Sequence, residues 1–133
     1  MVTWIGIAIG AIIVGFVLRS ALSGTSVKAA TDLARETGKL DLLIEAIESR
    51  PESEQATRWD RAIDSLWNSY AREEAARLTM EAAKRCESDA LQYWMRQVLE
   101  VEPEIASEVF TPEFLNEHFD PEIAAKCGKG CCG

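Results

Sequence analysis

The chain has 133 residues, with 22 acidic and 14 basic side chains and a formal charge of −8. This length allows one compact domain beside a membrane segment, and excludes two ordinary domains plus such a segment. The acidic balance argues against a protein that wraps nucleic acid, because affinity for phosphates comes from clustered Lys and Arg.

The first predicted element is an apolar segment over residues 1–22. No charged side chain precedes Arg19, and a helix of about 20 residues crosses a hydrocarbon core. We therefore predict a transmembrane anchor over 1–22, followed by a short polar linker over 23–26. A cleaved signal peptide is the main alternative, but it would need a basic stretch before the apolar one. A buried core helix is a further alternative, which would need a large protein around it.

The anchor also carries a pattern that favours helix–helix contact. Small residues let two membrane helices approach closely, and here they recur four positions apart, as Gly6 with Gly10 and Ala11 with Gly15. Self-association through this face is one interpretation; the other is that Gly and Ala are simply common in membrane helices. Arg19 and Lys28 follow the anchor and no basic residue precedes it, which predicts a single-pass protein whose soluble domain is cytoplasmic.

Residues 27–126 are predicted to form an all-α soluble domain. The clearest helix has Leu40, Leu43, Ile44 and Ile47 on one face and stops near Ser49. Other helices are expected over 27–37, over 54–69, around 75–86, and after the cap Ser88 as far as Pro103. No segment outside the anchor alternates with the period of a strand.

Three tryptophans lie on the apolar faces of two of these helices: Trp59, Trp67 and Trp94. They are interpreted either as core residues or as the lining of a partner-binding groove. An aromatic cofactor site is a further alternative, although aromatics at helical spacing are usually core.

The last third contains a nine-residue repeat over 102–128, with Pro103, Pro112 and Pro121 in the same phase. Each unit is predicted to be a two-turn helix with Pro in its first turn, and Thr111 and Asp120 are expected to cap the second and third. Short helices packed on the core are one interpretation of this region. The other is an exposed acidic ladder, since residues 100–122 hold eight acids and no Lys or Arg.

Paired helices closed by proline resemble the packing of tetratricopeptide solenoids. The segment ALQYWMRQVLEVEP resembles the second helix of such a unit, whereas Ala75 and Thr79 stand where Trp and Gly are usual. The resemblance is to a mode of packing, and it implies a solenoid-like stack of helical hairpins.

The tail KCGKGCCG is the sharpest candidate for chemistry. Three thiols within six positions can approach one soft ion, and zinc would need a fourth ligand, for which His118 and Cys86 are the candidates. The candidate metal ligands are Cys127, Cys131, Cys132 and His118. Copper(I), an iron–sulfur cluster, lipid attachment, cross-linking and a tail without a role are the alternatives. The ending also resembles, over a handful of positions, the zinc-binding tail of some bacterial translocation proteins.

No catalytic constellation stands out. His118 is the only histidine, and no Ser or Cys can be assigned to it by spacing. The leading hypothesis is a non-enzymatic, membrane-tethered helical interaction or scaffold module, an accessory subunit of a membrane assembly. Its expected partners are lipid, other proteins and itself through the anchor, but not nucleic acid. The second hypothesis is a metal- or thiol-handling protein, with zinc as the candidate cofactor. An enzyme, supported only by generic acids and His118, is the third.

Overall fold

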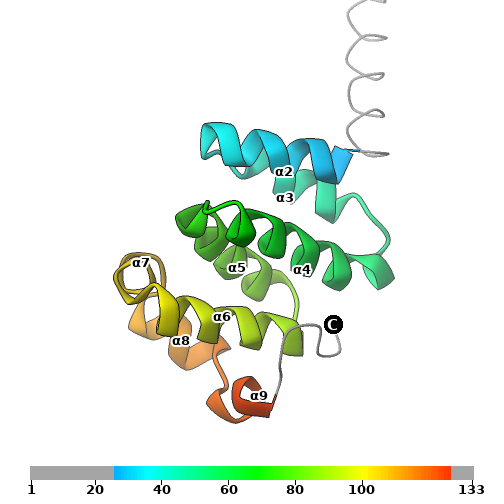
Figure 1. The fold of residues 1–133 in the computed structure, drawn as a ribbon. Helices are drawn as coiled ribbons and strands as arrows, with labels where there is room; N and C mark the ends of the chain where they lie inside the picture. Colours follow the sequence, from blue (N-terminus) through cyan, green and yellow to red (C-terminus); the bar gives the residue numbers. More distant parts are fainter. Residues whose placement is uncertain (1–25, 127–133) are drawn as a thin grey trace, which may run out of the picture.

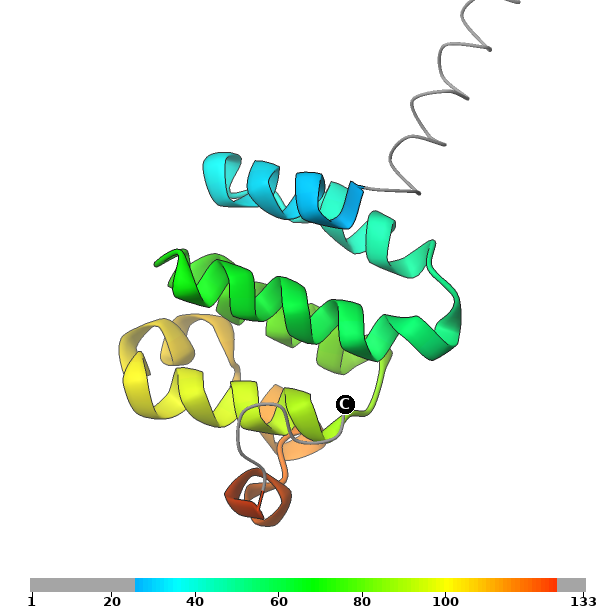
Figure 2. The same cartoon turned by 45° about the vertical axis from the view of Figure 1, so that its right-hand side comes forward.

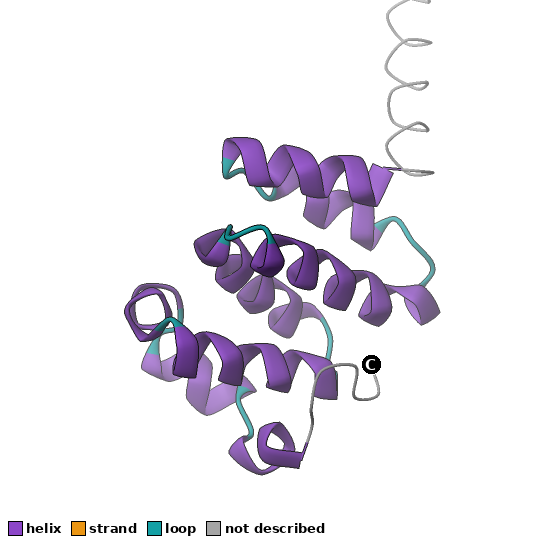
Figure 3. Cartoon of the chain, viewed as in Figure 1, coloured by secondary structure: helices purple, strands orange, loops and turns teal. Residues whose placement is uncertain are grey.

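A computed structural model describes residues 26–126, and this part of the chain is all-α (Figure 3). Its helices are α2 (Ser26–Thr37), α3 (Asp41–Glu48), α4 (Glu52–Asn68), α5 (Arg72–Arg85), α6 (Asp89–Val101), α7 (Pro103–Val109), α8 (Pro112–His118) and α9 (Pro121–Lys126). No strand occurs between residues 26 and 126. The prediction of an all-α domain is therefore confirmed for the described residues, with helix ends that shift by up to three positions, as at Glu52 and Arg72.

The helices stack in three layers (Figures 1 and 2). The first layer is the α2–α3 pair, the second is α4 with α5, and the third holds α6 to α9. Neighbouring layers touch through α2 with α4, α3 with α4, and α5 with both α6 and α7. The helices α2 and α3 run antiparallel, and so do α4 and α5, because only a few residues connect the two helices of each pair.

The core runs continuously through the layers. Trp59, Ile63 and Leu66 of α4 are fully buried, as are Trp94 and Met95 of α6. Between them lies α5, in which four of the buried residues are alanines: Ala75, Ala76, Ala82 and Ala83. Small side chains allow two helix axes to approach closely, so α5 can pack against α4 on one side and against α6 and α7 on the other.

Two turns use a left-handed backbone. Gly38 ends α2 with φ of +74°, and its N–H bonds the carbonyl of Ala34 at 2.8 Å. Tyr70 follows α4 with φ of +63°, and here the N–H of Ala71 reaches back to the carbonyl of Leu66 at 2.9 Å. Such bonds satisfy carbonyls that a helix end leaves unpaired and reverse the chain.

The proline units form helices as predicted. Thr111 Oγ1 accepts the N–H of Phe114 at 3.1 Å, and Asp120 Oδ1 accepts the N–H of Glu122 at 3.0 Å. Phe110 stacks on Phe114, with 5.4 Å between ring centroids. Helices of two turns would not be stable alone. The caps and this aromatic pair hold them in place.

Among residues 26–126, no helix has both the length and the apolar composition that a membrane crossing requires. The predicted anchor over residues 1–22 lies outside the described residues, so it stays a prediction.

Candidate functional site

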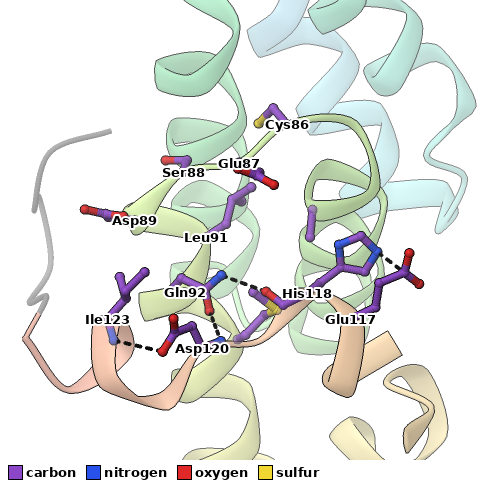
Figure 4. A pocket seen from close by; sticks show the side chains of 12 residues that line it. Cys86, Glu87, Ser88, Asp89, Leu91, Gln92, Glu117, His118, Asp120 and Ile123 are labelled. Atoms are coloured by element: carbon purple, nitrogen blue, oxygen red, sulfur yellow. Dashed lines mark hydrogen bonds and ion pairs between the residues drawn. The ribbon is translucent and has the colours of Figure 1, made fainter. Parts of the chain in front are cut away.

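A pocket of about 460 Å³ opens between the second and third layers (Figure 4). The end of α5, the α5–α6 connection and the first turns of α6 form one side of it. The end of α8 and the start of α9 form the other. Its polar and sulfur-bearing lining residues are Cys86, Glu87, Ser88, Asp89, Gln92, Met95, Glu117, His118 and Asp120.

Gln92 holds the floor of this pocket together. Its amide nitrogen donates to the carbonyl of His118 at 2.7 Å, and its amide oxygen accepts the N–H of Asp120 at 2.7 Å. Figure 4 shows Gln92 between these two residues. A second tie lies nearby, where Arg96 donates to the carbonyl of Ala124 at 2.8 Å. These bonds fix α9 against α6 and so fix the shape of the pocket.

His118 takes part in the pocket wall. Its ring centroid lies 4.9 Å from that of Phe114, and its Nε2 lies 3.9 Å from a carboxylate oxygen of Glu117. In the described part of the chain, the hydroxyl of Ser88 is used elsewhere, since it accepts the N–H of Ala90. Between residues 26 and 126, the contacts of His118 are with Phe114, Glu117 and Gln92, and none of them is a Ser or Cys side chain.

Cys86 lies at the opposite end of the lining, directly after α5. Its side chain is half-buried, and this burial raises the pKa of the thiol, because the thiolate loses solvation. A thiol with a raised pKa is a poorer nucleophile at neutral pH than a free cysteine. Cys86 is thus not an activated thiol, although it is a candidate ligand for a metal that would displace its proton.

The described residues do not complete a metal site. No group of three His, Cys, Asp or Glu between residues 26 and 126 is placed to hold an ion. Cys127, Cys131 and Cys132 lie outside the described residues, so the candidate ligand set stays a prediction. The structure adds that His118 and Cys86, the two candidates for a fourth ligand, line one pocket.

The tryptophans are core residues within this chain. Trp59 and Trp94 are essentially inaccessible and Trp67 is nearly so. Trp67 and Trp94 lie 6.0 Å apart, and the indole N–H of Trp94 donates to Asp60 Oδ1 at 2.7 Å. Burial by their own helices fits the core interpretation, and Trp59 and Trp94 offer no surface to a partner. At Trp67 the guanidinium of Arg72 covers the ring, 4.0 Å from its centroid.

A second pocket, of about 520 Å³, lies between α3 and α5. Charged side chains span it: Arg85 is paired with Glu48 of α3 and, at 2.6 Å, with Glu81 of its own helix. Arg77 donates to the carbonyl of Gly38 at 2.6 Å. These residues tie the first layer to the second. Helical periodicity did not identify them, because charged residues on an outer face look alike whether or not they reach a neighbouring helix.

Sequence reasoning also missed the exposed apolar side chains. Tyr70 is 83% exposed, Val101 49%, Leu42 42% and Leu33 41%. Each sits within or beside a predicted helix, where an apolar residue is normally assigned to the core. The small residues proposed to pair anchors, Gly6, Gly10, Ala11 and Gly15, lie outside the described residues.

In comparisons with known proteins, no family model, curated protein or solved structure matches this chain. The class of protein is therefore defined by fold alone, as an all-α arrangement of helical layers over residues 26–126.

Proposed function

We propose that the chain is a membrane-tethered, solenoid-like helical interaction module, an accessory subunit of a membrane-associated assembly. The observation that carries this proposal is the layered stacking of helix pairs. Stacked pairs bury one another in the middle and leave the outer faces of the terminal layers for other molecules. A transmembrane anchor over residues 1–22 would hold those faces at the bilayer and raise their effective concentration toward membrane partners.

The protein-binding face of this module is the acidic surface of α7, α8 and α9. Glu104, Glu108 and Glu113 are exposed, and no Lys or Arg lies between residues 100 and 122. Of the eight acids in that range, Glu102 has an arginine partner within the described part of the chain, Arg72 at 3.4 Å. A surface rich in exposed carboxylates favours a basic partner and accelerates its association.

Purification of the full chain from its native membranes tests this proposal. We expect the chain to extract only with detergent and to bring a protein partner with it in fixed stoichiometry. The triple variant Glu104→Lys, Glu108→Lys, Glu113→Lys should lose that partner while helix content and Tm stay near those of the parent.

A matched control carries the same number of reversals on other elements: Glu36→Lys, Glu52→Lys and Glu73→Lys, which are also exposed. This control should keep the partner. Recovery of the chain in the soluble fraction would contradict the tether. Equal loss of the partner in both triple variants would contradict the assignment of the binding face.

A metal- or thiol-handling protein is the second candidate function. One observation favours it: His118 and Cys86 line the pocket that α9 closes, and the sequence runs from α9 directly into Cys127. Metal analysis of the full chain purified under reducing conditions tests this candidate. Metal below stoichiometry that does not change when Cys127, Cys131 and Cys132 are all replaced by Ser would reject it.

A further inference from the structure

A chain of cation–π contacts leads from the core to the surface at the α4–α5 turn. The guanidinium of Arg72 lies 4.0 Å from the ring centroid of Trp67, which is buried. The same guanidinium lies over the ring of Tyr70, 5.7 Å from its centroid. Tyr70 is the outermost member of this chain and is 83% exposed. Most of its aromatic ring is therefore open to solvent.

Arg72 is held in place by hydrogen bonds. Its Nε donates to the carbonyl of Trp67 at 3.2 Å, and its Nη1 donates to Glu102 Oε1 at 3.4 Å. The second bond joins the start of α5 to the junction of α6 and α7. Because Glu102 balances the charge of Arg72, a further cation that approached the ring of Tyr70 would not meet an uncompensated positive charge.

The fold gains little from the tyrosine at this turn. The backbone of Tyr70 is left-handed, with φ of +63°, and a side chain with a Cβ is strained there. Gly38 makes the corresponding turn after α2 without that strain. Strained backbone positions that the packing does not require are concentrated at functional sites. The exposed ring is therefore a candidate contact for another molecule.

The surroundings of Tyr70 are acidic. Glu73 follows it by three positions, while Glu100 and Glu104 lie two positions before and after Glu102, and all three are exposed. Helix α7 packs against α5, and both views show the α4–α5 turn and α7 at the same end of the molecule (Figures 1 and 2). Tyr70 thus borders the acidic surface of α7, α8 and α9.

We propose that the exposed ring of Tyr70 receives an arginine side chain of a basic protein partner, whose guanidinium stacks on the ring while the acidic surface of α7 to α9 binds the partner's other basic residues. The proposal rests on the basic partner of the proposed function. It adds the residue type that the partner presents and the side chain that receives it. It does not depend on the anchor predicted over residues 1–22.

The chemistry of the site selects this occupant. The face of a tyrosine ring attracts cations, and neighbouring carboxylates raise their local concentration. Arginine is favoured over lysine because its planar guanidinium also stacks on the ring. A second copy of this chain is a poorer occupant. Residues 26–126 hold all 22 acidic side chains and only 12 of the 14 basic ones, so two copies repel each other.

Peptide binding to the full chain in dodecyl maltoside tests the proposal. The probes are two blocked peptides of equal length and charge, one alternating Arg with Ala and the other alternating Lys with Ala. The protein is isotope-labelled on its two tyrosine rings, so that NMR reports on Tyr70 directly. Tyr93 is the internal control, because it lies on α6, partly buried, with its ring centroid 5.1 Å from that of Trp94.

We expect the arginine peptide to bind the parent chain about two- to fivefold more tightly than the lysine peptide. It should shift the ring resonances of Tyr70 and leave those of Tyr93 in place. Tyr70→Phe should keep the preference, because phenylalanine retains an aromatic face. Tyr70→Gly should abolish it without lowering Tm, so that lost binding cannot be attributed to lost folding. Leu42→Ala, which truncates another exposed apolar side chain, should bind as the parent does.

An arginine preference that Tyr70→Gly leaves intact would overturn the inference. The acidic binding face of the proposed function would still stand in that case if Glu104→Lys, Glu108→Lys, Glu113→Lys together weakened both peptides. If neither peptide binds the parent chain, the basic partner itself is rejected, and the inference with it. Ring resonances of Tyr70 that move with dodecylphosphocholine but with neither peptide would assign the ring to a lipid headgroup, which also overturns the inference.

Discussion

Tyr70 holds the left-handed position after α4 that Gly38 holds after α2, with φ of +63° at the tyrosine and +74° at the glycine. A side chain with a Cβ is strained in this region, and a bulky one is rarely found there. Tyr70 is also 83% exposed, so burial does little to offset the strain. Its contact with another side chain is a cation–π arrangement in which the guanidinium of Arg72 lies 5.7 Å from its ring centroid.

Replacing Tyr70 with Gly should therefore raise the free energy of unfolding, by about 0.5–1 kcal/mol after the entropy of glycine in the unfolded chain is subtracted. The matched change Gly38→Ala should lower it by about 1 kcal/mol, because alanine must adopt the same strained φ. Chemical denaturation of both variants measures the two changes in the free energy of unfolding. Two shifts of the same sign would contradict the equivalence of the two turns.

Trp94 and Trp59 differ in their indole N–H groups. Trp94 donates to Asp60, whereas the buried Nε1 of Trp59 has no acceptor in the described structure. Trp94→Phe and Trp59→Phe remove similar volumes, so both should destabilise by leaving a cavity. We expect Trp94→Phe to cost about 1 kcal/mol more, because it also removes a hydrogen bond to a charged group. Thermal or chemical unfolding of the two variants provides the comparison, and equal losses would argue against the Asp60 contact.

Gln92 should control the local stability of α9. Gln92→Ala removes the bonds to His118 and Asp120, so hydrogen exchange in α8 and α9 should accelerate while α4 and α5 keep their protection. Gln97→Ala is the control, since Gln97 lies on the same helix and is also partly buried. If the two variants exchange alike, Gln92 does not hold the α8–α9 region in place.

The raised pKa of the Cys86 thiol predicts that the stability of the fold falls at alkaline pH. Burial raises the pKa of this thiol above the ordinary value of 9.0. The folded state then retains a proton that the unfolded state releases, so the contribution to stability is complete below pH 9.0 and falls as pH rises above it. The loss between neutral and alkaline pH should be smaller in Cys86→Ala than in the parent chain. Denaturation across that range measures the difference, with Cys127, Cys131 and Cys132 replaced by Ser in both proteins.

Alkylation gives an independent check on the same thiol. With the three tail cysteines replaced, Cys86 should react with iodoacetamide near neutral pH more slowly in the folded chain than in denaturant, because less thiolate is present and access is reduced. Faster reaction in the folded chain would mean that its pKa is lowered, which would make Cys86 an activated thiol.

The sequence by itself determined the helices. Apolar residues at a spacing of three and four, Ser88 and Thr111 as caps, and proline in the first turn of each short helix are local signals, since they act within one helix and its flanks. For the same reason the repeat over 102–128 could be resolved into α7, α8 and α9 before any packing was known.

Only the tertiary structure decided which side chains meet across helices. Trp59 and Trp94 are buried in the structure. The sequence allowed either a core or a partner-binding groove for them, because burial depends on which helix covers a face. The tertiary structure joined His118 and Cys86 in one pocket, although 32 positions separate them in the chain. It also left Leu33, Leu42 and Tyr70 exposed, although large apolar side chains are usually buried. Periodicity predicts the face of a helix on which a residue lies, whereas contact between helices far apart in sequence is set by the stacking of the layers.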